Sequence, residues 1–367
     1  MKRGAIIILC AAYAGVAMGG AGFYSGEFAG IPVHPRIESR GGAGVAHADD
    51  IDGADYNPAS IGRWKGIRVA YSHYFLVEKI SFEHFAFGLP LPAGNFLVET
   101  TVMHTPELSG GSAASGDTGV GGATFTLGYG LEIPGVRELR VGVVARGLYE
   151  KVGVGKSGTV AFDLGGTYDF NIPGRKIGID GKNFSIGLAI QNLGAGYKGR
   201  PLQRPFSIGA RYEIGFNQAV REAFFLDAYI PNGEKSEIKI GTEIRFVSHA
   251  FLRFGYGLGR EARGFTVGAG GTFRGFSLDY GFIPMGEIGM THIVGVRFAL
   301  DGLRARRVAP APRKNTTGPA PLPELDGVTP SDVAPATEKK NDKPAKKAPK
   351  KTRETPTAPP VPELDSK

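Results

Sequence analysis

After its first twenty-odd residues, the chain has no apolar run long enough to cross a membrane as a helix, which needs about 20 residues. It also has only one cysteine in 367 residues, Cys10. Cys10 lies in the expected signal peptide, and Leu9 before it is not the small residue that a lipoprotein requires. We therefore expect a mature chain without a disulfide or a cysteine-based metal site or nucleophile.

Catalytic and metal-binding patterns are missing as well. The sequence holds no Gly-x-Ser-x-Gly element and no zinc motif. Its glycine-rich stretch 268–271 lies inside an expected strand, where glycine suits close packing rather than phosphate binding. We expect no enzymatic activity, no cofactor and no metal. The seven histidines are scattered without i,i+4 spacing: His34, His47, His73, His84, His104, His249 and His292.

The two ends of the chain differ from its middle. A positive start, an apolar stretch at 5–17 and small residues after it predict a signal peptide over residues 1–21, with a membrane anchor as the alternative. Residues 301–367 are rich in Pro and Lys and have no aromatic residue, which predicts a disordered tail. The net charge of +8 belongs to these ends, because residues 22–301 hold 27 basic and 27 acidic residues. A nucleic-acid partner is therefore not expected.

The middle of the chain, residues 66–300, alternates apolar and polar side chains. In 206–214, apolar residues at even positions alternate with Ser, Gly, Arg and Glu at odd positions. Successive strand side chains point to opposite faces, so each such segment has one apolar and one polar or small face. We expect about fourteen strands, near 67–76, 79–89, 94–104, 121–132, 139–150, 158–171, 182–193, 203–215, 221–231, 235–247, 250–259, 263–273, 275–283 and 290–300.

This pattern favours an all-β fold, a transmembrane antiparallel β-barrel of about 14 strands. Strands of about 10 residues suit a tilted crossing of a bilayer, and an even number brings both ends of the barrel to one side. A soluble β-sandwich also alternates, but its second face would carry core residues rather than Gly, Ser, Thr and opposed charges. If the first strand rises from the periplasm, the long loop 105–120 faces outside and the short connections 247–250 and 273–275 face the periplasm. The long connection 172–181 and the short first loop are exceptions.

Three motifs resemble one family of such barrels. An acidic pair, Asp49 and Asp50, precedes Asn57-Pro58-Ala59, and the stretches 183–194 and 278–292 also resemble the family. That family is PorV/PorQ, which is related to the FadL long-chain fatty-acid transporters. The resemblance implies a fourteen-stranded barrel in the outer membrane of a Gram-negative-type bacterium.

The resemblance also implies an N-terminal hatch in the lumen, which we place at residues 22–65. The barrel would then occupy residues 66–300, and residues 301–367 would form a periplasmic tail. The tail departs from the family pattern, in which the chain ends at the last strand.

The candidate hatch motif is Asp49, Asp50, Asn57, Pro58 and Ala59. Pro58 fixes its own φ and keeps the residue before it extended, so the motif helps to set the hatch conformation; an ordinary loop turn is the alternative. The neighbouring aspartates, with Asp52 and Asp55 included, offer oxygen ligands to a divalent cation. Pairing with lumen arginines is favoured instead, because a calcium-loop spacing is absent.

Six charged residues on the polar faces are candidates to face the lumen. They form either a wall that contacts the hatch or guides a solute, or an ion-pair network that fills the interior. The candidates are Arg211, Lys239, Glu243, Arg245, Arg253 and Arg297.

The tail repeats a short unit, at 322–326 and 361–365, on either side of a Lys-rich run, 339–353. The repeat could dock a periplasmic protein and the run could bind an anionic cell-wall polymer; a solvated linker is the alternative. The docking candidates are Pro323, Glu324, Leu325, Asp326, Pro362, Glu363, Leu364 and Asp365.

The expected function is FadL-like passage of hydrophobic or small molecules across the outer membrane. A solute would enter between the external loops, meet the hatch, and leave by hatch movement or by a lateral gap between strands, with the glycine-rich segment 263–273 as one source of kinks. The alternative is a PorV-like barrel that serves secretion or anchors the envelope by binding exported or periplasmic proteins. Expected partners are therefore outer-membrane lipid and a hydrophobic small molecule, or proteins bound through the tail or loops.

Overall fold

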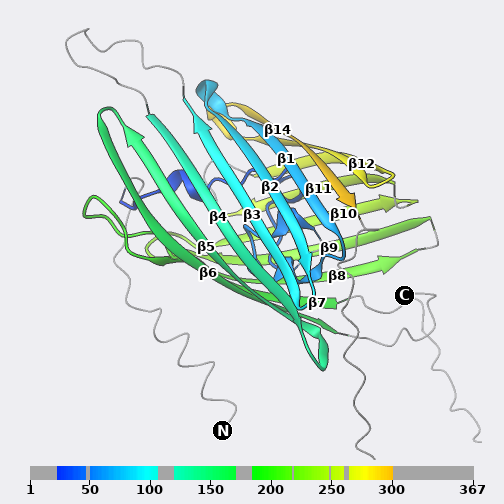
Figure 1. Ribbon diagram of the computed structural model, residues 1–367. Coiled ribbons are helices and arrows are strands. Elements are labelled where there is room, and N and C mark those ends of the chain that lie inside the picture. Colours follow the sequence, from blue (N-terminus) through cyan, green and yellow to red (C-terminus); the bar gives the residue numbers. More distant parts are fainter. Residues whose placement is uncertain are drawn as a thin grey trace, which may run out of the picture. The chain divides into compact units, whose positions relative to one another are not determined.

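Fourteen antiparallel strands close into one barrel in the computed structural model (Figure 1). Each strand pairs with its neighbours in sequence, and β1 (Ile67–Phe75) closes the barrel against β14 (Met290–Leu300). All described residues belong to one compact unit. The predicted fold class is confirmed. The structure describes residues 23–46, 50–105, 120–170, 184–216, 219–247, 249–259 and 264–300.

The observed strands overlap the fourteen predicted segments one by one. The main difference is that β5 and β6 extend beyond the prediction, because they pair with each other as far as Val152 and Gly155. The other strands are β2 (Ser81–Leu91), β3 (Gly94–His104), β4 (Val120–Ile133), β5 (Val136–Val152), β6 (Gly155–Phe170), β7 (Phe184–Gly194), β8 (Phe206–Gly215), β9 (Val220–Ile230), β10 (Glu237–Phe246), β11 (Ala250–Leu258), β12 (Phe265–Phe273) and β13 (Phe276–Pro284).

The period-two pattern of the sequence becomes the outer and inner faces of the barrel wall. In β8, Ile208 and Tyr212 are 43% and 40% exposed, whereas Ser207 and Arg211, the residues directly before them, are buried. The same holds in β11, where Leu252 and its even-numbered neighbours point outward. The predicted apolar faces are therefore the outer surface, and the polar and small residues face inward.

A segment of residues 23–46 and 50–65, called the inner segment below, fills the interior. Short helices give it shape: η1 (Glu27–Gly30), α2 (Pro35–Glu38), η2 (Ile51–Gly53) and η3 (Pro58–Arg63). Its η3 contacts β3 to β6 and its α2 contacts β12 to β14, so the inner segment touches opposite parts of the wall and must lie inside the closed barrel. Figure 1 shows it in dark blue, surrounded by the strands. Two further short helices, η4 (Val77–Lys79) and η5 (Gly286–Ile288), lie in strand connections.

No helix of the described residues is long and apolar enough to span a membrane.

Glycines of the wall allow the backbone of the inner segment to come close. A Cβ atom at Gly165 in β6 would overlap Asn57 Oδ1, and one at Gly255 in β11 would overlap the backbone of Gly41. Both glycines lie on the inner face. They explain part of the high glycine content: where the wall meets the inner segment, there is no room for a side chain.

The inner segment runs from one end of the barrel to the other. We call the end of the barrel at which the odd-numbered strands end the odd-loop end. The opposite end, where β1 begins and β14 ends, is the even-loop end. Ser25 pairs with Leu202 in the β7–β8 connection, at the odd-loop end. At the even-loop end, Asn95 donates hydrogen bonds to the carbonyl oxygens of Ile61 (2.6 Å) and Trp64 (3.1 Å). The chain thus crosses the interior before it enters β1.

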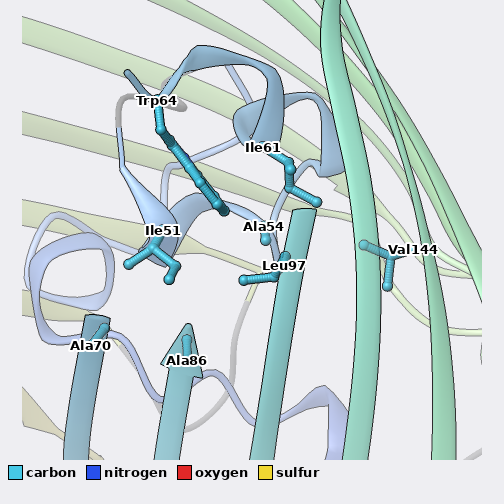
Figure 2. Packing of buried hydrophobic residues seen from close by; sticks show 8 residues of the cluster. All are labelled: Ile51, Ala54, Ile61, Trp64, Ala70, Ala86, Leu97 and Val144. Carbon is cyan, nitrogen blue, oxygen red and sulfur yellow. The ribbon is translucent and has the colours of Figure 1, made fainter. Parts of the chain in front are cut away.

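One apolar cluster joins the inner segment to the wall near the even-loop end. Figure 2 shows Ile51, Ala54, Ile61 and Trp64 of the inner segment together with residues of β1, β2, β3 and β5. Trp64, the only tryptophan of the chain, is 4% exposed. Its fluorescence therefore reports on the packing of the inner segment. The wall residues are Ala70, Ala86, Leu97 and Val144.

Several predictions fall on residues outside the described ranges. They are the signal peptide (1–21), Asp49 of the hatch motif, most of the loop 105–120, the connection 172–181, and the tail (301–367) with its docking candidates.

Candidate functional site

The Asn57-Pro58-Ala59 motif lies deep in the interior, at the start of η3. The Asn57 side chain is fully buried; its Oδ1 accepts a hydrogen bond from Ala59 N (3.0 Å), which caps the helix. Its Nδ2 donates to Val45 O (2.8 Å) within the inner segment and to Gly166 O (3.1 Å) of the wall. One amide therefore holds two turns of the inner segment and a strand together.

The described aspartates of the inner segment face basic groups of the wall. Asp50 pairs with Arg297 and lies 3.7 Å from Arg68 Nε. Asp52 Oδ2 lies 3.1 Å from Arg297 Nε, and Asp55 Oδ1 lies 2.6 Å from Arg146 Nη2. These contacts match the arginine-pairing alternative. In the described ranges, no group of three His, Cys, Asp or Glu residues is arranged to hold a metal ion.

Three of the six lumen candidates form an ion-pair network with the inner segment. They are Glu243 of β10, Arg253 of β11 and Arg297 of β14. Glu243 Oε2 accepts from Arg253 Nε at 2.7 Å and from Arg36 Nε of α2 at 3.1 Å. Asp279 of β13 then links Arg253 (2.6 Å) to Arg297 (2.7 Å). We call this group, with Asp50 and Asp52, the arginine network.

The other three candidates also lie on the inner face, but they are placed differently. Arg211 pairs with Glu213 within β8. Arg245 lies 3.6 Å from Glu243 and above the ring of Phe251, and Lys239 Nζ lies 4.5 Å from the ring centre of Tyr229. Cation–π contacts of this kind offset part of the cost of burying a charge.

A second polar group, which the sequence did not reveal, joins the inner segment to β2, β3, β5 and β6. His34 Nε2 lies 2.8 Å from Asp55 Oδ2, and Asp55 in turn binds Arg146. Arg146 Nη2 is 3.2 Å from Asp163 Oδ2 of β6. We call this group, with His84 and Glu99, the histidine cluster. In the sequence, the alternation of apolar and polar residues predicts that its wall members point inward. The alternation does not predict which distant residues they contact.

The charges change the pKa values of groups in the inner segment. Burial alone would lower the pKa of His34, but the hydrogen bond and negative charge of Asp55 outweigh it and raise the pKa. Burial would raise the pKa of Asp55, but Arg146 and His34 hold it far below its usual range. Burial raises the pKa of Asp52 and lowers that of Arg40 to about 9.

An apolar cluster at the odd-loop end is the second feature that the sequence did not reveal. Phe28 and Val33 of the inner segment pack against Tyr74, Phe82, Ile283 and Ile293, four wall side chains that point inward. A mostly polar inner face was expected, so this end of the lumen corrects that expectation. The two large residues of β1 and β2, Tyr74 and Phe82, are fully buried.

The predicted source of a lateral gap, 263–273, is regular in its described residues: β12 pairs with β11 and β13 without a shift in register. Register shifts occur instead between β4 and β5, at Glu132 and Ile133, and between β6 and β7, at Phe162 and Leu164. There Asn192 has a left-handed backbone (φ 57°), and its N–H donates to Asp163 Oδ1 at 2.6 Å.

Comparison with known proteins gives similarity of fold. No family model matches the chain, so the PorV/PorQ assignment stays a prediction, and no curated protein matches it. Among solved structures, the chain is similar to the toluene transporter TbuX of Ralstonia pickettii (14% identity, TM-score 0.47, covering 72% of this chain and 98% of that one). It is also similar to the monoaromatic hydrocarbon channel CymD (11%, 0.49, 74% and 98%) and to the toluene transporter TodX of Pseudomonas putida (10%, 0.48, 71% and 95%).

Proposed function

We propose that the protein is an outer-membrane barrel that passes hydrophobic small molecules, with the inner segment acting as a hatch. A solute would enter at the odd-loop end, which faces the outside, and the even-loop end would face the periplasm. It would leave by movement of the inner segment or through a gap between strands. The barrel itself would have no catalytic role.

The outer surface supports a membrane location. Large apolar side chains of neighbouring strands point outward and are about half exposed, among them Leu164, Leu188, Leu226 and Leu278. An apolar surface that surrounds a barrel with a polar interior is typical of outer-membrane barrels. In water, such a surface would favour aggregation.

The observation that carries the transport proposal is the apolar cluster at the odd-loop end. A solute coming from that end meets Phe28, which is 8% exposed and fills a space between wall residues. Gly122 of β4 lies directly against the Phe28 ring and leaves room for it. We infer that Phe28 occupies an apolar site that a hydrophobic solute takes when the inner segment moves away.

Binding of a hydrophobic fluorescent dye to the purified protein tests this inference. Phe28→Ala should empty the site and tighten dye binding by about tenfold, equivalent to ~1.4 kcal/mol. Phe28→Trp should keep the site filled and leave binding at the wild-type level or below. The matched control is Phe125→Ala, which removes an exposed ring from the outer face of β4. Equal binding by Phe28→Ala and the control would contradict the proposal.

Location and orientation need a separate measurement. The outer-membrane fraction should give a band that shifts on heating, as folded barrels do. Protease added to intact cells should cut only in connections at the odd-loop end. A band in the soluble periplasmic fraction that does not shift would contradict the membrane assignment.

A further inference from the structure

The histidine cluster holds three carboxyl groups in a buried space but only one basic group that is always charged, the guanidinium of Arg146. Three carboxyl groups, those of Asp55, Glu99 and Asp163, face the single guanidinium of Arg146. All three wall residues of this set are less than a tenth exposed. Charges buried without a counter-charge are costly, so the space favours states in which some of these groups carry protons.

Two imidazoles complete the cluster. The rings of His34 and His84 meet edge to face, with their centres 4.7 Å apart. His84 Nδ1 is 2.9 Å from Thr101 Oγ1, and its Nε2 is buried without a hydrogen-bond partner. His34 lies between this ring and Asp55, with Asp52 Oδ1 4.0 Å from its Nδ1.

Glu99 is a second group that favours a bound proton. It is 3% exposed, its Oε2 is buried without a hydrogen-bond partner, and the carboxyl groups of Asp55 and Asp163 lie near it. A carboxyl group buried beside other carboxyl groups favours its neutral form. The groups that face the cluster are Glu38, Asp52, Asp55 and Tyr56 of the inner segment, His84 of β2, Glu99 of β3, Arg146 of β5 and Asp163 of β6.

We propose that the inner segment takes up protons when it packs against β2 to β6, so that this contact forms a latch that opens as the pH rises. The proton sites are His34 and Glu99. Opposite them, Glu243 and Asp279 of the arginine network keep their charges over the same pH range. Both are paired with guanidiniums, which do not deprotonate there: Arg36, Arg253 and Arg297. One side of the inner segment therefore loosens while the other stays attached.

The latch opens as the pH rises, rather than as it falls, because docking raises the pKa of His34. Contact with Asp55 raises the pKa of His34 above its ordinary value of 6.5. Its contribution to the latch is therefore complete below pH 6.5 and is lost as the pH rises through the raised pKa. A proton held by Glu99 only in the docked state acts in the same direction. This inference does not depend on what the barrel transports.

Acrylamide quenching of Trp64 in the purified full-length protein measures the latch. Trp64 belongs to the apolar cluster that joins the inner segment to β1, β2, β3 and β5. Between about pH 5.5 and about pH 9, the quenching constant of the wild type should rise about twofold. Glu99→Gln keeps the shape but needs no proton, and His34→Gln removes the titrating ring, so each should flatten this rise.

The matched control is Glu83→Gln. Glu83 also pairs with a histidine, His73 (2.5 Å), but on the outer face of the wall. This variant should keep the wild-type pH profile. A flat wild-type profile, or an unchanged slope in both Glu99→Gln and His34→Gln while their heat-shifted bands show folded barrels, would overturn the proposal.

Discussion

Two groups of charged residues hold the inner segment, one on each side, and they differ in how they respond to pH. We call these two sides its flanks. The arginine network on β10, β11, β13 and β14 balances guanidiniums against paired carboxylates, such as Glu243 between Arg36 and Arg253. The histidine cluster on β2, β3, β5 and β6 has three carboxyl groups, two imidazoles and only one guanidinium. The first flank is insensitive to pH near neutrality and the second is not. A segment attached in this way can be released from one side without leaving the barrel.

The largest effect is expected from Glu243→Gln. It leaves Arg36 and Arg253 buried around a neutral group, which should cost about 3–5 kcal/mol and weaken the docking of the inner segment at all pH values between about 5 and 9. The urea midpoint of the Trp64 fluorescence change measures this loss. The control is Glu222→Gln on the outer face of β9, which should change stability by less than about 0.5 kcal/mol. Equal midpoints would show that the arginine network does not hold the segment.

Arg146→Met should have a smaller effect that depends on pH. It leaves Asp55 and Asp163 without their cation, but these carboxylates accept protons when the pH falls. The loss should be about 3 kcal/mol near pH 7 and should decrease toward pH 5. The same urea titration at both pH values checks it. A loss that stays constant with pH would remove the distinction between the two flanks.

Gly165→Ala tests the close approach of the wall to Asn57. The added Cβ would overlap Asn57 Oδ1 and should cost about 1–3 kcal/mol. Gly166→Ala adds the same atom on the outer face, where the nearest atom, Arg140 O, is 3.8 Å away. The two variants should therefore differ in their urea midpoints, and identical midpoints would argue against tight packing on this flank.

Glu213→Gln should have the smallest effect. Glu213 pairs with Arg211 and Arg221 at the even-loop end, within the wall, and the Arg221 side chain is about half exposed. All three side chains belong to the wall, and water reaches the group through Arg221, so its loss should leave the docking of the inner segment unchanged. Trp64 quenching should stay at the wild-type level. A clear increase would mean that a third group of charges also holds the inner segment.

The sequence predicted the wall well and its interior less well. Alternation located most of the strands and their outer faces, because the outward side chains of a strand are apolar along most of its length. The hatch motif pointed to Asn57, whose hydrogen bonds explain why an amide is needed there. The lumen candidates included Glu243, Arg253 and Arg297 but not Arg146, Asp163 or Glu99. These three stand out only through the inner segment, whose Asp55 pairs with Arg146.

What the sequence determined by itself is a strand count, a period and a division into two faces, since these depend on neighbours along the chain. Only the tertiary structure decided which inward residues meet. His34 and Asp55 reach Arg146 because the inner segment crosses a closed barrel, and Phe28 reaches Tyr74 and Ile293 for the same reason. Contacts between residues so distant in sequence depend on the closure of the wall and on the path of the inner segment. Local patterning carries no information about either.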